Sequence, residues 1–254
     1  MTVPLIIPNS RHTCYAPTLI IFMNRPLQLS LVRHAESARN AAKGQNIYFT
    51  DDEARKNVKG IPDQEISITL KGQEQAKITG VKLREEFGTF DYVYHSGYKR
   101  TRDTAEAILN AYSAEERLRV KVRENLFIRE RDPGYTYDMT EDEVLQHFPW
   151  FPEYWKTFGG FLSRPVGGES LAQVVERVYT FLNMLFRDRA GKKILVVTHG
   201  GTLRCFRYLL ERWTYDQALK WPDGQSPKNC GVTTYMYDRE QERLILKNYN
   251  KVYY

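Results

Sequence analysis

Leu31-Val-Arg-His-Ala-Glu-Ser37 closes a run with the pattern of a β-strand that begins at Leu27. The stretch places Arg33 and His34 side by side where a buried strand is predicted to end. A guanidinium attracts a phosphate dianion, and a neutral imidazole beside it offers a lone pair that can attack phosphorus. Arg-His pairs also occur by chance in many proteins, so this stretch indicates a site only together with others.

A second predicted strand ends in the same way, at Lys193-Ile-Leu-Val-Val-Thr-His199-Gly-Gly. A third, Asp91–His95, has a similar buried pattern, and the three strands alternate with helical segments as parallel βαβ units do. The carboxyl ends of parallel strands meet at one edge of the sheet, where open α/β sheets bind ligands. We therefore expect His34 and His199 to share one site, with Gly200 and Gly201 allowing the backbone to approach a ligand.

Helical periodicity and turn residues complete the predicted fold. Apolar spacing and end signals predict helices over Leu70–Phe87, Tyr98–Tyr112 and Ser170–Ala190, and two further strands over Val232–Tyr237 and Arg243–Tyr249. Ser170 and Gln173 form a capping-box pattern, and Gly191 is expected to end that helix. The pattern predicts an α/β fold, a three-layer α/β/α sandwich around a mostly parallel central sheet.

Two segments interrupt this alternation, and both are expected to be cap insertions over the pocket. Residues 43–67 are polar and rich in turns, whereas residues 132–166 are rich in aromatics and prolines. The aromatic side chains either line the pocket or only pack the insertion against the core, and these readings are compatible. Residues 1–24 are expected to be an N-terminal extension, and residues 25–254 the single domain.

Arg33-His34-Ala35-Glu36-Ser37 resembles the signature of the histidine phosphatase superfamily, also called the phosphoglycerate mutase-like family. Four later segments resemble the family's motifs and follow in the same order: Ser96–Ala105, Arg129–Gly134, Gly168–Ser170 and Thr198–Gly200. The similarity extends from about Leu27 to the C-terminus. Each motif is modest alone, but five in the right order are a strong signal.

The resemblance implies a role for each matching residue. His34 would be the nucleophile that forms a phosphohistidine, with its other ring nitrogen donating to a carbonyl or similar acceptor. Arg33 and Arg100 would hold the phosphate, and a protonated His199 would balance the charge on the transferring group. Glu130 would protonate the leaving oxygen and then activate water.

Several of these assignments have competitors in the sequence. Lys99 and Arg102 flank Arg100 and are expected to be solvated surface residues. Glu36 and Glu169 compete with Glu130 for the acid role, and we expect them to be structural carboxylates. Asn40 and Gly200 are further expected substrate contacts.

Composition limits the class of protein. The chain has 254 residues and a formal net charge of +6, but its lysines and arginines are interspersed with acids, which argues against nucleic-acid binding. No apolar stretch is long enough to span a membrane. Three widely spaced cysteines, Cys14, Cys205 and Cys230, indicate a reducing compartment, and we expect a cytoplasmic protein. We expect no cofactor or metal, and the sequence leaves monomer and homodimer open.

Together these features predict a metal-independent phosphomonoesterase that acts through a phosphohistidine on a small phosphorylated metabolite. A phosphoglycerate mutase-type phosphotransferase, which uses the same residues, is the alternative, and a non-catalytic phosphate-binding module is a third. The chain departs from the family at Ala35, where many members have glycine, and at Gly97, where aspartate or proline is frequent. Residues 132–138 lack the lysine-bearing stretch typical of the mutases, which favours the phosphatase.

Overall fold

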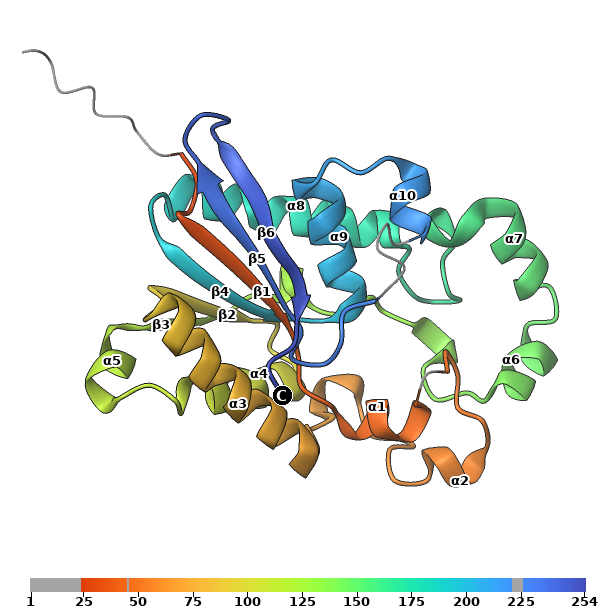
Figure 1. The fold of residues 1–254 in the computed structure, drawn as a ribbon. Coiled ribbons are helices and arrows are strands. Elements are labelled where there is room, and N and C mark those ends of the chain that lie inside the picture. Colours follow the sequence, from red (N-terminus) through yellow and green to blue (C-terminus); the bar gives the residue numbers. More distant parts are fainter. Residues whose placement is uncertain (1–23, 45, 221–225) are drawn as a thin grey trace, which may run out of the picture.

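The computed structural model describes residues 24–44, 46–220 and 226–254. Its six strands form one sheet in the order β3-β2-β4-β1-β5-β6 (Figure 1). They are β1 Gln28–Arg33, β2 Tyr92–His95, β3 Lys121–Glu124, β4 Lys193–Thr198, β5 Val232–Asp238 and β6 Arg243–Lys251. The strands β1 to β4 pair in parallel, and β5 and β6 are antiparallel additions. The expected mostly parallel sheet is confirmed.

Strand β3 is the one the sequence analysis did not predict. It has four residues, Lys121-Val-Arg-Glu124, and all of them are exposed. It lies at the edge of the sheet and pairs only with β2. An edge strand needs no continuous apolar run, so its sequence carries little of the signal that marked the buried strands.

Helices cover both faces of the sheet (Figure 1). α3 (Leu70–Phe87) and α4 (Lys99–Leu109) pack on one face, and α8 (Leu171–Asp188) and α9 (Gly200–Leu210) on the other. The short helix α5 (Ala114–Arg119) leads into β3. This arrangement confirms the three-layer sandwich. In the described ranges, every helix is too short or too polar to cross a bilayer.

The predicted helix starts agree with the structure to within one residue, but two helices end earlier than expected: α4 at Leu109 and not at Tyr112, and α8 at Asp188, before Gly191. The Ser170 hydroxyl accepts the Gln173 N–H while the Gln173 side chain accepts the Ser170 N–H, so the capping box that starts α8 is confirmed. In α3, by contrast, Leu70 is 83% exposed and Val81 41% exposed. The buried face of α3 includes Ala76, Gly80 and Leu83. α3 approaches α4 closely at this face, since a Cβ on Gly80 would lie 2.5 Å from the Ile108 carbonyl oxygen.

The two insertions form a lobe at one end of the sheet (right in Figure 1). Its elements are α1 (Ala38–Lys43), α2 (Asp52–Arg55), the 3₁₀ turns η1 (Asp63–Glu65) and η3 (Gly134–Thr136), α6 (Glu141–His147) and α7 (Phe151–Leu162). A β-bridge joins Phe49 to Thr140, and Arg55 forms a two-pronged ion pair with Glu143. The remaining elements are η2 (Leu126–Ile128), between β3 and the lobe, and α10 (Tyr215–Lys220), which packs on α7.

Candidate active site

Strand register brings the two strand-end histidines together. Arg33 in β1 is level with Thr198 in β4, and the His34 N–H donates to the Thr198 carbonyl at 2.8 Å. The residue that follows each strand is a histidine, and the two ring centroids are 5.1 Å apart. Residues 165 positions apart in the sequence thus meet because neighbouring parallel strands end at the same level.

Burial and one hydrogen bond prepare the His34 ring as a nucleophile. Its Nδ1 lies 2.8 Å from the Ala35 carbonyl oxygen. Because a carbonyl can only accept, Nδ1 carries the proton and Nε2 keeps its lone pair. Burial, together with the positive charges of Arg100 and Arg33, holds the pKa of His34 well below its usual value. The ring is therefore neutral at physiological pH, and it borders the cavity.

His199 is held in the opposite tautomer by a chain of hydroxyl groups. Thr101 Oγ1 donates to the Tyr98 carbonyl at 2.7 Å, so it accepts from Ser96 Oγ at 2.9 Å. Because the Ser96 hydroxyl proton is donated to Thr101, Ser96 Oγ can only accept from His199 Nε2, which lies 2.8 Å away. The remaining nitrogen, Nδ1, carries a lone pair and is buried without a partner. Burial and the positive charge of Arg100 also lower the pKa of His199, so its ring is neutral here and not protonated as expected.

The two proposed phosphate-binding arginines differ in their partners. Arg33 Nη1 donates to the Pro227 carbonyl at 2.7 Å, and its Nε is buried without a partner. Arg100 is bound to Asp63, with Nη1 at 3.0 Å and Nη2 at 3.2 Å from the two carboxylate oxygens. A phosphate group that uses these nitrogens competes with Asp63. The predicted competitors are surface residues, since Lys99 pairs with Asp103 and Arg102 is exposed.

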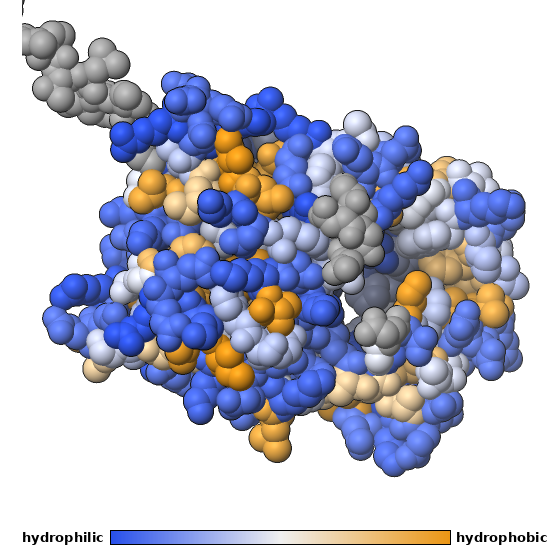
Figure 2. Space-filling model, viewed as in Figure 1, coloured by the Kyte–Doolittle hydropathy of each residue, from blue (hydrophilic) through white to orange (hydrophobic). Residues whose placement is uncertain are grey.

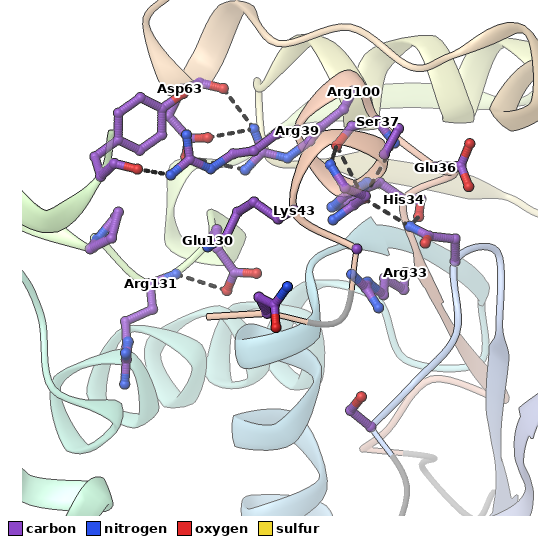
Figure 3. Close-up of a pocket in the computed structure, with 18 residues that line it drawn as sticks. Arg33, His34, Glu36, Ser37, Arg39, Lys43, Asp63, Arg100, Glu130 and Arg131 are labelled. Atoms are coloured by element: carbon purple, nitrogen blue, oxygen red, sulfur yellow. Dashed lines mark hydrogen bonds and ion pairs between the residues drawn. The ribbon is translucent and has the colours of Figure 1, made fainter. Parts of the chain in front are cut away.

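Glu130 lies between η2 and η3 and points into the cavity together with Lys43 (Figure 3). Its Oε1 accepts the Arg131 N–H at 2.9 Å. A Cβ on Gly201 would lie 2.7 Å from the same oxygen, so the absent side chain makes room for this carboxylate. Arg177 of α8 anchors the loop that carries Glu130: its guanidinium donates to the Glu130 carbonyl and pairs with Glu169.

The carboxylates that competed with Glu130 have structural partners. Glu169 pairs with Arg177 and Arg129 and accepts the Asp132 N–H. Glu36 accepts from Thr69 and pairs with Lys71. Both sets of contacts agree with the structural role expected for these two residues.

The amide of Asn40 is oriented by its neighbours. Its Oδ1 accepts from Ser37 and from Asn229 Nδ2 at 3.1 Å, and Asn229 also donates to the His34 carbonyl at 2.9 Å. This leaves Asn40 Nδ2 as the donor available at the cavity that the residue lines. Gly200 is the first residue of α9, and a Cβ there would meet Arg33 at an ordinary 3.7 Å. The glycine whose backbone approaches a site residue closely is therefore Gly201, beside Glu130.

A cavity of about 540 Å³ opens at this edge of the sheet, beneath the lobe, and Figure 2 shows the hollow between the lobe and the main body. Five basic and three acidic side chains line it: Arg33, Arg39, Lys43, Arg100 and Arg131, with Glu36, Asp63 and Glu130. The positive excess favours an anionic ligand. Burial and the nearby Arg39 lower the pKa of Lys43 to about 8.

The sequence analysis did not identify several polar residues of this cavity, and Lys43, Asp63, Arg131 and Asn229 are examples. Three of them lie in or beside the insertions, where no motif gave a signal, and Asn229 lies between α10 and β5. Within the described ranges, no three histidine, cysteine, aspartate or glutamate side chains are grouped closely enough to hold a metal ion.

This arrangement of histidines, arginines and a carboxylate agrees with a match to a family model. The model described as histidine phosphatase superfamily (branch 1) covers residues 29–250. The chain belongs to the histidine phosphatase superfamily. It is therefore an enzyme of the histidine phosphatase type.

Curated relatives and solved structures agree with this membership. The chain is 31% identical over 209 residues to phosphoglycerate mutase-like protein AT74H of Arabidopsis thaliana, covering 74% of this chain and 67% of that protein. It is 30% identical over 226 residues to phosphoserine phosphatase 1 of Hydrogenobacter thermophilus, covering 87% and 91%. The fold is similar to the alpha-ribazole phosphatase of Shigella flexneri, with a TM-score of 0.69, 20% identity and coverage of 88% and 96%.

Proposed function

We propose that this enzyme is a metal-independent phosphomonoesterase that acts on a small phosphorylated metabolite through a phosphohistidine. The observation that carries the proposal is the neutral His34 ring, whose Nδ1–H is bound to the Ala35 carbonyl while Nε2 is left with its lone pair. Arg33 lies beside it with a buried Nε that has no partner. A nucleophile and a cation for the phosphate oxygens are thus adjacent.

The proposed reaction has two steps. His34 Nε2 attacks phosphorus, the P–O bond to the leaving group breaks, and Glu130 gives its proton to the departing oxygen. Glu130 then takes a proton from water, and the resulting hydroxide attacks the phosphohistidine. This second step releases inorganic phosphate, restores neutral His34 and returns the proton to Glu130. Arg33 and Arg100 bind the oxygens of the transferring group in both steps.

The first test is acid-quench trapping of enzyme labelled from a ³²P-phosphomonoester. We expect an acid-labile label on the wild-type protein, none on His34→Ala, and normal labelling of His147→Asn, which alters an exposed histidine of α6 outside the cavity. Vanadate should inhibit turnover and chelators should not. Undiminished label and turnover in His34→Ala would contradict the proposed nucleophile, and loss of turnover on chelation would contradict the metal-independent reaction.

The mutase alternative is favoured by one observation, the mutase-like name of the Arabidopsis relative. The two activities differ in whether water or a second hydroxyl group accepts the phosphoryl group. Incubation with 3-phosphoglycerate, with and without bisphosphoglycerate, separates them. Isomerisation without release of phosphate would favour the mutase, and phosphate release supports the hydrolase.

We also propose that the enzyme works in a reducing compartment such as the cytoplasm. Cys205 and Cys230 support this, because both are free thiols in the described structure. Cys14 lies outside the described residues.

A further inference from the structure

A second cavity of about 710 Å³ continues from the first into the lobe. The two cavities share five charged lining residues, Arg33, Arg39, Lys43, Glu130 and Arg131. Beyond these, its wall includes a group of apolar side chains from the second insertion, which we call the apolar chamber: Val144, Leu145, Phe151, Pro152, Trp155 and Pro165. The chamber therefore begins where the proposed reaction takes place.

The chamber wall is built from part of the aromatic cluster in residues 132–166. Phe151 and Trp155 lie on successive turns of α7, and their ring centroids are 5.3 Å apart. Val144 and Phe151 are buried, which holds the wall in place. Trp150, by contrast, is 53% exposed and lies outside both cavities. The aromatic segment thus lines the cavity with one part and packs the lobe with another.

Arg131 lies where the charged cavity meets the chamber. Its guanidinium carbon is 5.5 Å from the centroid of the Trp155 ring. Its backbone N–H donates to Glu130, and the guanidinium has no carboxylate or carbonyl partner among the described residues. A planar guanidinium beside an indole offers a flat, partly apolar surface on which a ring can pack.

We propose that the apolar chamber binds the leaving group, and that the preferred substrates are phosphomonoesters whose alcohol carries a bulky apolar body, best a ring. The inference rests on the proposed function, because that function places the leaving oxygen at Glu130. Glu130 and Arg131 line both cavities, so the carbon atoms beyond that oxygen lead into the chamber. A short polar alcohol such as glycerate would leave these apolar walls in contact with water only.

The chamber also has charged groups in its wall. Outside the shared residues, its charged lining side chains are Glu141 and Arg204. The substrate body can therefore bear some polar groups, while its apolar part packs against side chains such as Phe151 and Trp155. Each methylene group buried there strengthens binding about fourfold.

The test compares ethyl phosphate with 2-phenylethyl phosphate, whose alcohols have similar acidity and so depart with similar ease. We expect kcat/KM for the phenylethyl ester to exceed that for the ethyl ester by at least about tenfold, mainly through KM. Trp155→Ala should reduce this ratio several-fold, whereas Trp150→Ala, in the same aromatic cluster but outside the chamber, should leave it unchanged. Leu145→Asn is a second variant at a half-exposed chamber position that folding tolerates more readily.

A binding measurement separates this inference from the proposed function. In His34→Ala, calorimetry with 2-phenylethylphosphonate and ethylphosphonate reports the chamber without any turnover. Tighter binding of the phenylethyl compound, reduced by Trp155→Ala, supports the chamber even if hydrolysis is absent. Equal affinity for the two phosphonates, or equal kcat/KM for the two esters, would overturn the inference while leaving the phosphohistidine reaction standing.

Discussion

At the scale of the residue, we predict that the hydroxyl chain of Ser96 and Thr101 behind His199 makes phosphate binding a proton-linked event. Because Ser96 Oγ accepts, His199 Nε2 must carry the ring proton and donate it. Nδ1, which has no partner, therefore keeps its lone pair. An oxyanion also offers only lone pairs, so it cannot form a hydrogen bond with Nδ1 until Nδ1 takes up a proton. In the free protein, burial and the charges of Arg100, His34, Arg177 and Arg33 keep the pKa of His199 low. A bound dianion raises that pKa, so binding takes up a proton and weakens as the pH rises.

We therefore expect tungstate, a dianion near pH 7.5, to bind with net proton uptake. Calorimetry in buffers of different ionisation enthalpy measures it. Ser96→Ala frees Nε2 from donating, so neutral His199 can carry its proton on Nδ1, and this variant should take up about one proton fewer. Ser113→Ala, at the cap of α5 on the surface, is the control. Equal uptake in wild type and Ser96→Ala would show that this chain does not set the tautomer.

At the scale of elements, the lack of a side chain at Gly201, near the start of α9, leaves space for the Glu130 carboxylate. In Gly201→Ala, the new Cβ would lie 2.7 Å from Glu130 Oε1, so the carboxylate must move. We expect kcat to fall about 10²-fold, as displacements near 1 Å do. Helix stability should rise by about 1 kcal/mol, because alanine favours helix more than glycine.

Gly200→Ala is the matched control for this prediction. It adds the same methyl group one residue earlier in α9, where the nearest atom of Arg33 would be at an ordinary 3.7 Å. Steady-state kinetics and thermal melting of both variants separate activity from stability. A fall in kcat of the same size in both would indicate a general requirement for flexibility at the start of α9 and not a steric effect on Glu130.

The parts of the site that the sequence predicted are those that regular elements position. His34 and His199 follow strands whose buried pattern is visible in the sequence, and parallel pairing brings their ends together. Asp63 was not predictable in this way, because its contact with Arg100 depends on the path of an irregular insertion. The tautomer of His199 was also missed, since it depends on the relative positions of two hydroxyl groups rather than on any local pattern.

At the scale of the whole molecule, one ion pair joins the two insertions that enclose both cavities. Arg55 of α2 is 4% exposed and binds Glu143 of α6 through both terminal nitrogens. This contact and the Thr140 backbone lower the pKa of Glu143 to about 2 from its usual 4.5. A depressed carboxylate pKa stabilises the fold above the unfolded value, and the contribution is lost as the pH falls from about 4.5 towards 2.

We expect Glu143→Gln to unfold more easily than wild type by about 1 kcal/mol at pH 7, a modest amount because Glu143 is 35% exposed to water. Glutamine keeps the capping-box acceptor for Thr140, so the change removes mainly the charge. Urea unfolding from pH 7 to pH 3 should show the difference from wild type shrinking as Glu143 itself becomes protonated. Glu53→Gln removes an exposed acid of α2, the helix that carries Arg55, and should cost less at every pH. A difference that stays constant with pH would mean that the two insertions are held together by their apolar contacts and not by this charge.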